Sequence, residues 1–213
     1  MNLKYACGCM LLFAFAGASF SARSATVYDE AASGDLSNSG LTPTQITVAN
    51  GSNQIFGTTG RGTAGIDRDY FTFSVPTGFD LSSLMVLPGT TSGGLSFIGL
   101  QAGNQVTLAT NPTDATGLLG WWLYGPGDIN TDLLPEMAVT AQGSSGFSVP
   151  LAAGNYSIWV QDFNRGSFSY GFDLAVAPAA PTPEPSTYGL ALSALGFAVV
   201  GFHRRKRRST IGR

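Results

Sequence analysis

Carboxylate and amide side chains at alternating positions are the groups of this 213-residue chain best suited to hold a metal ion. Two short runs, Asp-Arg-Asp and Asp-Ile-Asn-Thr-Asp, place such groups at every second residue. Their oxygens are hard ligands of the kind that Ca²⁺ prefers. The candidate calcium ligands are Asp67, Asp69, Asp128, Asn130 and Asp132. The same residue types are common in turns and strand caps, where they need no ion, so both interpretations stay open.

The second run begins like the calcium loop of an EF-hand, but it does not continue like one. The sixth position of that loop requires Gly and the twelfth requires Glu. These positions hold Leu133 and Val139. An EF-hand is therefore excluded, and calcium is the only cofactor for which the sequence offers candidate ligands.

Aromatic side chains form a second candidate site. The run Trp121-Trp122-Leu123-Tyr124 has apolar residues on both faces of a strand, with Trp122 and Tyr124 on the same face. Exposed aromatic rings beside acidic and amide groups suit the C–H faces and hydroxyls of sugars. The candidate ligand-binding residues are Trp122, Tyr124 and Trp159, with packing in the core as the alternative.

The distribution of cysteine, histidine and charge excludes several classes of function. Cys7 and Cys9 lie near the N-terminus and His203 near the C-terminus, so residues 25–176 contain neither residue type. This excludes Cys–His pairs, Ser-His-Asp triads and zinc sites in that segment. The same segment has three arginines and twelve acidic residues, a net charge of −9, and an acidic surface repels nucleic acid. We expect no enzyme activity and no nucleic-acid partner.

Residues 1–24 have the organisation of a secretory signal peptide. Lys4 precedes an apolar run at 6–20, and small residues follow that run. Ala22 and Ser24 supply a small-x-small cleavage site, so signal peptidase should cut before Ala25. We therefore expect an N-terminal signal helix, export by the secretion machinery, and a mature chain without cysteine.

The C-terminus has three consecutive segments. Residues 177–186 are proline-rich and predict a semi-rigid linker. Residues 187–202 are almost wholly apolar and predict a transmembrane helix of about 24 Å, slightly short of a ~30 Å hydrocarbon core. Residues 203–213 form a basic cytoplasmic tail, which places the preceding domain on the outer side of the membrane. The basic stop-transfer cluster is Arg204, Arg205, Lys206, Arg207 and Arg208.

This order of segments resembles the PEP-CTERM sorting signal. The tripeptide Pro183-Glu184-Pro185, one hydrophobic helix and an arginine-rich end follow one another over about residues 181–208. The resemblance implies that an exosortase recognises the tripeptide as a sorting motif. It further implies a transient stay in the inner membrane with the domain on the periplasmic side. Removal of the tail would then deliver the protein to the cell surface or extracellular matrix of a Gram-negative bacterium, often one that makes exopolysaccharide.

Between the two ends, residues 25–176 show the alternation typical of strands. Short apolar runs are separated by Gly, Asn, Asp, Ser and Pro, and no 3.6-residue period persists. We predict an all-β fold, an antiparallel and jelly-roll-like β-sandwich, flanked by the N-terminal signal helix and the C-terminal transmembrane helix. The predicted strands are 45–48, 69–75, 84–87, 95–100, 105–109, 119–124, 136–140, 156–160 and 168–176.

Two segments of this domain are similar to the bacterial pre-peptidase C-terminal domain, a jelly-roll-like sandwich. Residues 67–75 match an Asp-x-Asp-x-aromatic-x-Phe-x-Val pattern, and residues 151–160 match its late apolar-x-x-Gly-x-Tyr-x-x-x-Val strand. The tightly spaced Asp-x-Asp-Leu element usual in that family is absent. The resemblance implies an accessory adhesive or substrate-binding module, which in some members binds calcium at acidic loops.

These observations lead to one expected function and two alternatives. The expected function is a non-enzymatic protein of the cell surface or biofilm matrix that adheres to or contacts exopolysaccharide. The first alternative is a secreted hydrolase that uses a pair of carboxylates and is anchored by its tail. The second alternative is a module that binds another protein.

Overall fold

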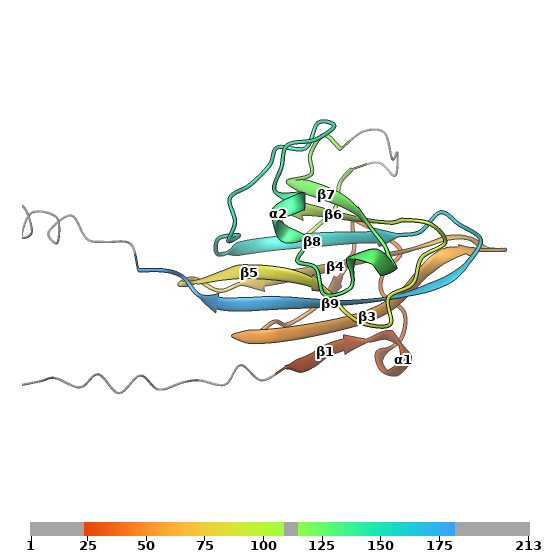
Figure 1. The fold of residues 1–213 in the computed structure, drawn as a ribbon, viewed down its shortest axis with the longest axis horizontal. Coiled ribbons are helices and arrows are strands. Elements are labelled where there is room, and N and C mark those ends of the chain that lie inside the picture. The colour runs from red at the N-terminus through yellow and green to blue at the C-terminus, as the bar shows by residue number, and fades with distance from the viewer. Residues whose placement is uncertain (1–23, 109–114, 182–213) are drawn as a thin grey trace, which may run out of the picture. The chain divides into compact units, whose positions relative to one another are not determined.

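The computed structural model describes residues 24–108 and 115–181 (Figure 1). The chain divides into two compact units, Met1–Ala177 and Pro178–Arg213, and nearly all described residues belong to the first. That unit is built almost wholly from strands. Its elements are β1 (Ala25–Asp29), α1 (Glu30–Ser33), β2 (Thr44–Gln45), β3 (Gly51–Gly62), β4 (Gly65–Val75), β5 (Phe79–Val86), β6 (Ser96–Ala102), β7 (Gly120–Tyr124), the 3₁₀ turn η1 (Pro126–Asp128), α2 (Leu134–Met137), β8 (Gly154–Gln161) and β9 (Gly166–Pro178).

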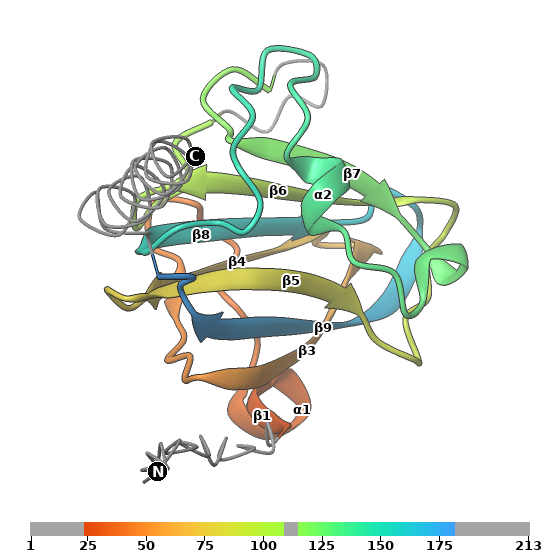
Figure 2. The same cartoon turned by 60° about the vertical axis from the view of Figure 1, so that its left-hand side comes forward.

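The strands form one curled sheet in the order β5-β9-β3-β4-β8-β6-β7. The sheet turns from one layer into the other within β4. Strands β3 and β4 pair only at their hairpin end, where Gly60 is opposite Asp67. From Arg68 onward, β4 pairs with β8 instead, and Arg68 is opposite Gln161. In Figure 2, β5 and β9 lie in front of β4 and β3, so the two layers of the curl overlap in this view.

The core lies inside the curl, because every second side chain of the long strands points inward. On β4 the inward residues are Phe71, Phe73 and Val75, and all three are buried. They belong to one large cluster with inward residues of β8 and β9, among them Ile158 and Phe172. Rings from opposite layers meet there, as in the edge-to-face contact of Tyr124 with Phe172, whose centroids are 5.1 Å apart.

The predicted all-β, mainly antiparallel fold is confirmed. Two pairings depart from the antiparallel expectation, because β1 runs parallel to β3 and β2 runs parallel to β4. The predicted strand at 105–109 is wrong for its described part, since residues 105–108 have no regular structure. The predicted strand at 136–140 is also wrong. Helix α2 begins at Leu134 instead, with Pro135 in its first turn and Met137 buried beside Leu134.

Strand β3, the longest neighbour of β9, was not predicted from the sequence. Its inward positions include Asn53, Gly57 and Thr59, which are small or polar and hide the apolar alternation. Gly57 is required where it lies, because a Cβ there would be 2.5 Å from the hydroxyl of Tyr170 on β9. The close approach of β3 to this tyrosine matters for the acidic site described below.

No helix within residues 24–108 and 115–181 is long and apolar enough to cross a membrane. The predicted signal helix and the predicted transmembrane helix at 187–202 lie outside the described residues.

Candidate functional site

A buried carboxyl group lies where β4 passes from one layer of the sheet to the other. Asp69 is the first inward-pointing residue of β4 after its pairing changes from β3 to β8. Its side chain is 0 % exposed. The hydroxyl of Tyr170 on β9 donates a hydrogen bond of 2.8 Å to Asp69 Oδ2. Asp69 Oδ1 has no hydrogen-bond partner.

Two more carboxylates reach this corner from the segment that follows β1. The short helix α1 begins at Glu30, and Asp29 caps it by accepting a hydrogen bond of 3.0 Å from the Ala31 amide. The Glu30 side chain turns inward and accepts hydrogen bonds from the backbone amides of Thr58 (2.7 Å) and Leu36 (3.1 Å). These contacts fix the position of the Glu30 carboxylate against β3.

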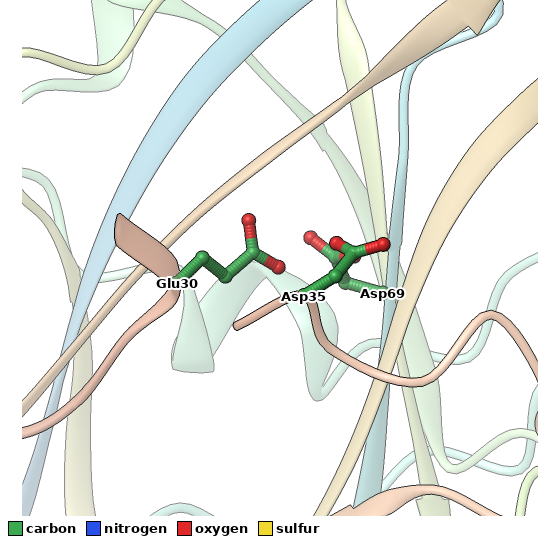
Figure 3. A group of neighbouring side chains, drawn as sticks. All are labelled: Glu30, Asp35 and Asp69. Carbon is green, nitrogen blue, oxygen red and sulfur yellow. The ribbon is translucent and has the colours of Figure 1, made fainter. Parts of the chain in front are cut away.

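Glu30, Asp35 and Asp69 together form the acidic corner, which Figure 3 shows with its carboxyl groups facing one another. One oxygen from each residue lies within 4.8 Å of the others. Glu30 is half-buried, Asp35 is exposed and Asp69 is buried, so the group runs from the surface into the core. It is the only group of three or more possible metal ligands among His, Cys, Asp and Glu of the described residues.

The two inner acids of the acidic corner, Asp69 and Glu30, have raised pKa values. Burial, together with the negative charges of Glu30, Asp67 and Asp35, raises the pKa of Asp69 to about 9, although the Tyr170 hydrogen bond lowers it in part. Burial also raises the pKa of Glu30, against the opposing hydrogen bonds from Leu36 and Thr58. Every charged group that acts on the pKa of Asp69 is itself an acid. No cation of the described residues therefore acts to lower the pKa of Asp69.

A cleft of about 240 Å³ borders this corner. Its lining includes Glu30, Thr58 and Tyr170, together with Pro88 and Gly89 from the segment after β5. Of the three acids of the corner, Glu30 lines the cleft.

The structure does not bring the five predicted calcium ligands together. Asp69 belongs to the acidic corner, and half-buried Asp67 is close enough to Asp35 for that charge to raise its pKa, after the larger effect of burial. Asp128 and Asp132 do not belong to the corner. Their carboxylates cap backbone amides instead, as the alternative interpretation expected.

Asp128 and Asp132 each accept hydrogen bonds from identified backbone amides. Asp128 Oδ2 accepts a hydrogen bond of 2.8 Å from the Gly125 amide, which closes η1. Asp132 Oδ1 accepts from the amides of Leu84 (2.8 Å) and Leu134 (3.0 Å), which ties β5 to the start of α2. Asn130 adopts a positive φ of 65°, a turn conformation that asparagine tolerates well.

Sequence reasoning missed Glu30 and Asp35. Both are more than thirty residues away from Asp69 in the chain. The parallel pairing of β1 with β3 brings Glu30 near it, and the bridge between Ser37 and Tyr70 brings Asp35 near it. One signal in the sequence did mark the site. Asp69 stands in register with Phe71, Phe73 and Val75, so a charge occupies a position that the alternation assigns to the core.

The three predicted aromatic ligand residues do not form one surface. Trp122 packs against the main core, and Tyr124 is 0 % exposed within it. Trp159 lies on the opposite face of the sheet from Trp122. Residues paired across neighbouring strands share a face, and Gly99 pairs with both Trp159 and Trp121, the residue before Trp122. Trp159 is 1 % exposed, so neither it nor Tyr124 presents a ring face to solvent.

A different aromatic row lies on the outer face of the sheet. Tyr70, Trp159, Phe97 and Trp121 follow one another across β4, β8, β6 and β7. The Phe97 and Trp121 rings are stacked with centroids 6.1 Å apart, and both side chains are only partly buried. Trp121 Nε1 donates to the carbonyl oxygen of Ala141 at 3.1 Å, which orients the indole ring.

A polar hollow lies at the C-terminal end of β6, the strand that carries Phe97 near its start. Gln101 lies on the outer face of β6 with Phe97, since the two are separated by an even number of residues. The hollow is lined by Leu41, Gln101, Ala102, Gly103, Asn104, Gln105 and Thr107. Gln101 is held there by hydrogen bonds to and from Thr107, of 2.8 and 3.1 Å. Amide groups thus lie at one end of this face and aromatic rings at the other.

The comparison with protein families identifies a PEP-CTERM protein-sorting motif at residues 181–208. The predicted sorting signal is therefore confirmed, and it supports an exosortase substrate that is exported toward the cell envelope and surface. The tripeptide at 183–185 and the basic cluster at 204–208 fall within the motif and lie outside the described residues. No curated protein and no solved structure matches the chain. The resemblance to the pre-peptidase C-terminal domain stays a prediction.

Proposed function

We propose that this exported chain acts at the cell surface or in the extracellular matrix as a non-enzymatic module that contacts polysaccharide. The sorting motif at 181–208 supports the delivery of the protein toward the cell surface. The outer face of β6 and β7 supports the polysaccharide contact. This face replaces the one predicted from Trp122 and Tyr124, whose side chains pack into the core.

The chemistry of the outer face matches the two kinds of surface on a sugar. A pyranose ring presents C–H groups on its faces and hydroxyls around its edge. The partly buried rings of Phe97 and Trp121 provide an apolar platform for the former. The amides of Gln101 and Asn104 can donate to and accept from hydroxyls at the other end of the strand.

The acidic corner is the only place in the described residues where a carboxylate-dependent hydrolase could gather three acids. A carboxyl group with a pKa of about 9 beside other carboxylates is the type of group that such enzymes use as a general acid. However, Asp69 is 0 % exposed, and a sugar ring would not reach it in this conformation. This burial favours binding over catalysis.

Retention of the protein on exopolysaccharide purified from the producing organism tests the proposal. We expect Trp121→Ala to weaken retention about tenfold, which corresponds to ~1.4 kcal/mol, because the platform loses its larger ring. Tyr124→Phe is the matched control, since that ring is buried in the core and should not affect retention. Equal retention of the wild type and Trp121→Ala would contradict the proposed surface. Release of reducing ends from the polysaccharide would favour the hydrolase instead.

A further inference from the structure

We propose that Glu30, Asp35 and Asp69 bind one Ca²⁺ ion at the corner where β4 passes between the two layers of the sheet. The proposal goes beyond the surface role proposed above and does not depend on it. Three observations support the site: the spacing of its oxygens, an unpartnered buried oxygen, and the way in which Glu30 is held.

The spacing of the oxygens suits calcium. Ca²⁺–oxygen distances are about 2.3–2.6 Å, so two ligands of one ion can be at most about 4.6–5.2 Å apart. The three carboxylate oxygens lie within 4.8 Å of one another, inside the separation that two ligands of one Ca²⁺ ion can have. Mg²⁺ binds at about 2.0–2.1 Å, which limits the same separation to about 4.2 Å. Mg²⁺ also gives up its water reluctantly and is usually bound by one or two carboxylates, so a group of three carboxylates favours the larger ion.

The unpartnered oxygen is independent evidence for a ligand. Buried polar atoms are almost always paired, because an unpaired one loses its water without compensation. Asp69 is 0 % exposed, and its Oδ1 has no hydrogen-bond partner. Besides the Tyr170 hydroxyl at its other oxygen, this carboxyl group has the carboxyl groups of Glu30 and Asp35 nearby, as Figure 3 shows. A bound cation would satisfy this oxygen and cancel the repulsion within the group.

The other two residues suit an ion that enters from solvent. Glu30 Oε2 is fixed by hydrogen bonds from the amide and the hydroxyl of Thr58. Its Oε1 accepts from the Leu36 amide and keeps a further lone pair for an ion. Asp35 is exposed and lies at the surface end of the group. Ca²⁺ takes six to eight oxygens, and water from the adjacent cleft would complete its coordination.

Calcium titration of the full chain, purified in detergent, tests the site. Binding of a ligand to the folded state alone raises Tm. For a Kd near 10⁻⁴ M, as in extracellular calcium modules, 10 mM CaCl₂ should raise Tm by about 5–10 °C relative to EDTA. The same concentration of MgCl₂ should give a clearly smaller rise. Isothermal titration calorimetry with CaCl₂ should give a stoichiometry of about one.

Two single substitutions separate this site from general charge effects. Asp35→Asn removes a ligand that is exposed and has no hydrogen bond to the described residues, so the variant should fold. We expect it to weaken calcium binding at least tenfold. Glu136→Gln removes an exposed acid from α2 and is the matched control, which should bind calcium like the wild type.

Three results would overturn the proposal. The first is a wild-type protein that shows neither a rise in Tm nor a heat of binding with CaCl₂. The second is an undiminished response in both Asp35→Asn and Asp69→Asn, which would place the ion elsewhere. The third is an equal loss of response in Asp35→Asn and Glu136→Gln, which would indicate charge screening.

Discussion

Two aspartates of this domain are buried, but they differ in how many hydrogen bonds their carboxyl oxygens accept. Asp162, in the turn between β8 and β9, and Asp69, in β4, are both 0 % exposed. Both oxygens of Asp162 are paired: Oδ1 accepts from the amide and the side chain of Asn164, each at 2.8 Å. Its Oδ2 accepts from the Gly93 amide and the Ser96 hydroxyl, each at 2.9 Å. Asp69 has the Tyr170 hydroxyl alone.

The pKa values follow from this difference in partners. Burial alone would raise the pKa of Asp162, but the hydrogen bonds from Asn164, Gly93 and Ser96 outweigh it and hold that pKa below its usual value. Burial raises the pKa of Asp69 to about 9, and the nearby carboxylates add to the effect. Burial of a carboxylate therefore does not define its role. Asp162 is ionised and structural, whereas Asp69 lacks the partners that an ionised carboxylate needs.

Removal of the well-paired carboxylate should have the largest effect. Asp162→Ala removes the acceptor of the Gly93, Ser96 and Asn164 donors, of which Ser96 is buried. We expect the free energy of unfolding to fall by about 3–4 kcal/mol, measured by urea denaturation at pH 7. A loss below ~1 kcal/mol would show that these hydrogen bonds do not hold the β8–β9 turn to the start of β6.

Removal of the ionisable group at the poorly paired position should act in the opposite direction. Asp69→Asn keeps an oxygen that can accept from the Tyr170 hydroxyl. It also removes the cost of protonating Asp69 on folding, which a folded-state pKa of about 9 imposes at pH 7. In EDTA we expect the variant to be more stable than the wild type by about 1–3 kcal/mol in the same urea assay. In 10 mM CaCl₂ this difference in stability should shrink or reverse, because calcium binding stabilises the wild type and not the variant. Destabilisation of Asp69→Asn in EDTA would contradict this view of the corner.

The pH dependence of stability should show a smaller effect of the Asp162 carboxylate. The folded-state pKa of Asp162 lies below its unfolded value of about 3.9, so its stabilisation is present above that value and is lost as the pH falls through the folded pKa. Urea midpoints between pH 6 and pH 2 should therefore decline more in the wild type than in Asp162→Asn. Parallel curves for the two proteins would show that Asp162 does not contribute through its charge.

The sequence predicts best those features that depend on one continuous stretch of residues. The sorting signal is a run of prolines, apolar residues and arginines within 181–208, and the comparison with families confirms it. Strands β4, β8 and β9 were predicted because large apolar side chains occupy their inward positions. Strand β3 was missed because Gly57 and Thr59 occupy the corresponding positions.

The candidate sites depend on contacts that a single sequence does not carry. Alternation correctly placed Trp122 and Tyr124 on one face of β7, but a strand apolar on both faces does not reveal which face is inward. Likewise, Glu30 meets Asp69 only because β1 runs parallel to β3, a pairing without a local pattern. The charge at the inward position of Asp69 was the one sign of this site in the sequence.

Both the polysaccharide contact and a calcium site of extracellular affinity require a domain outside the cytoplasm, so both depend on export. The intact mass of the protein recovered from the cell surface or medium tests this most directly. We predict a chain that begins at Ala25 and has lost the apolar and basic segments that follow the tripeptide at 183–185. A full-length chain of 213 residues found in the cytoplasm, with its leader still attached, would contradict the account.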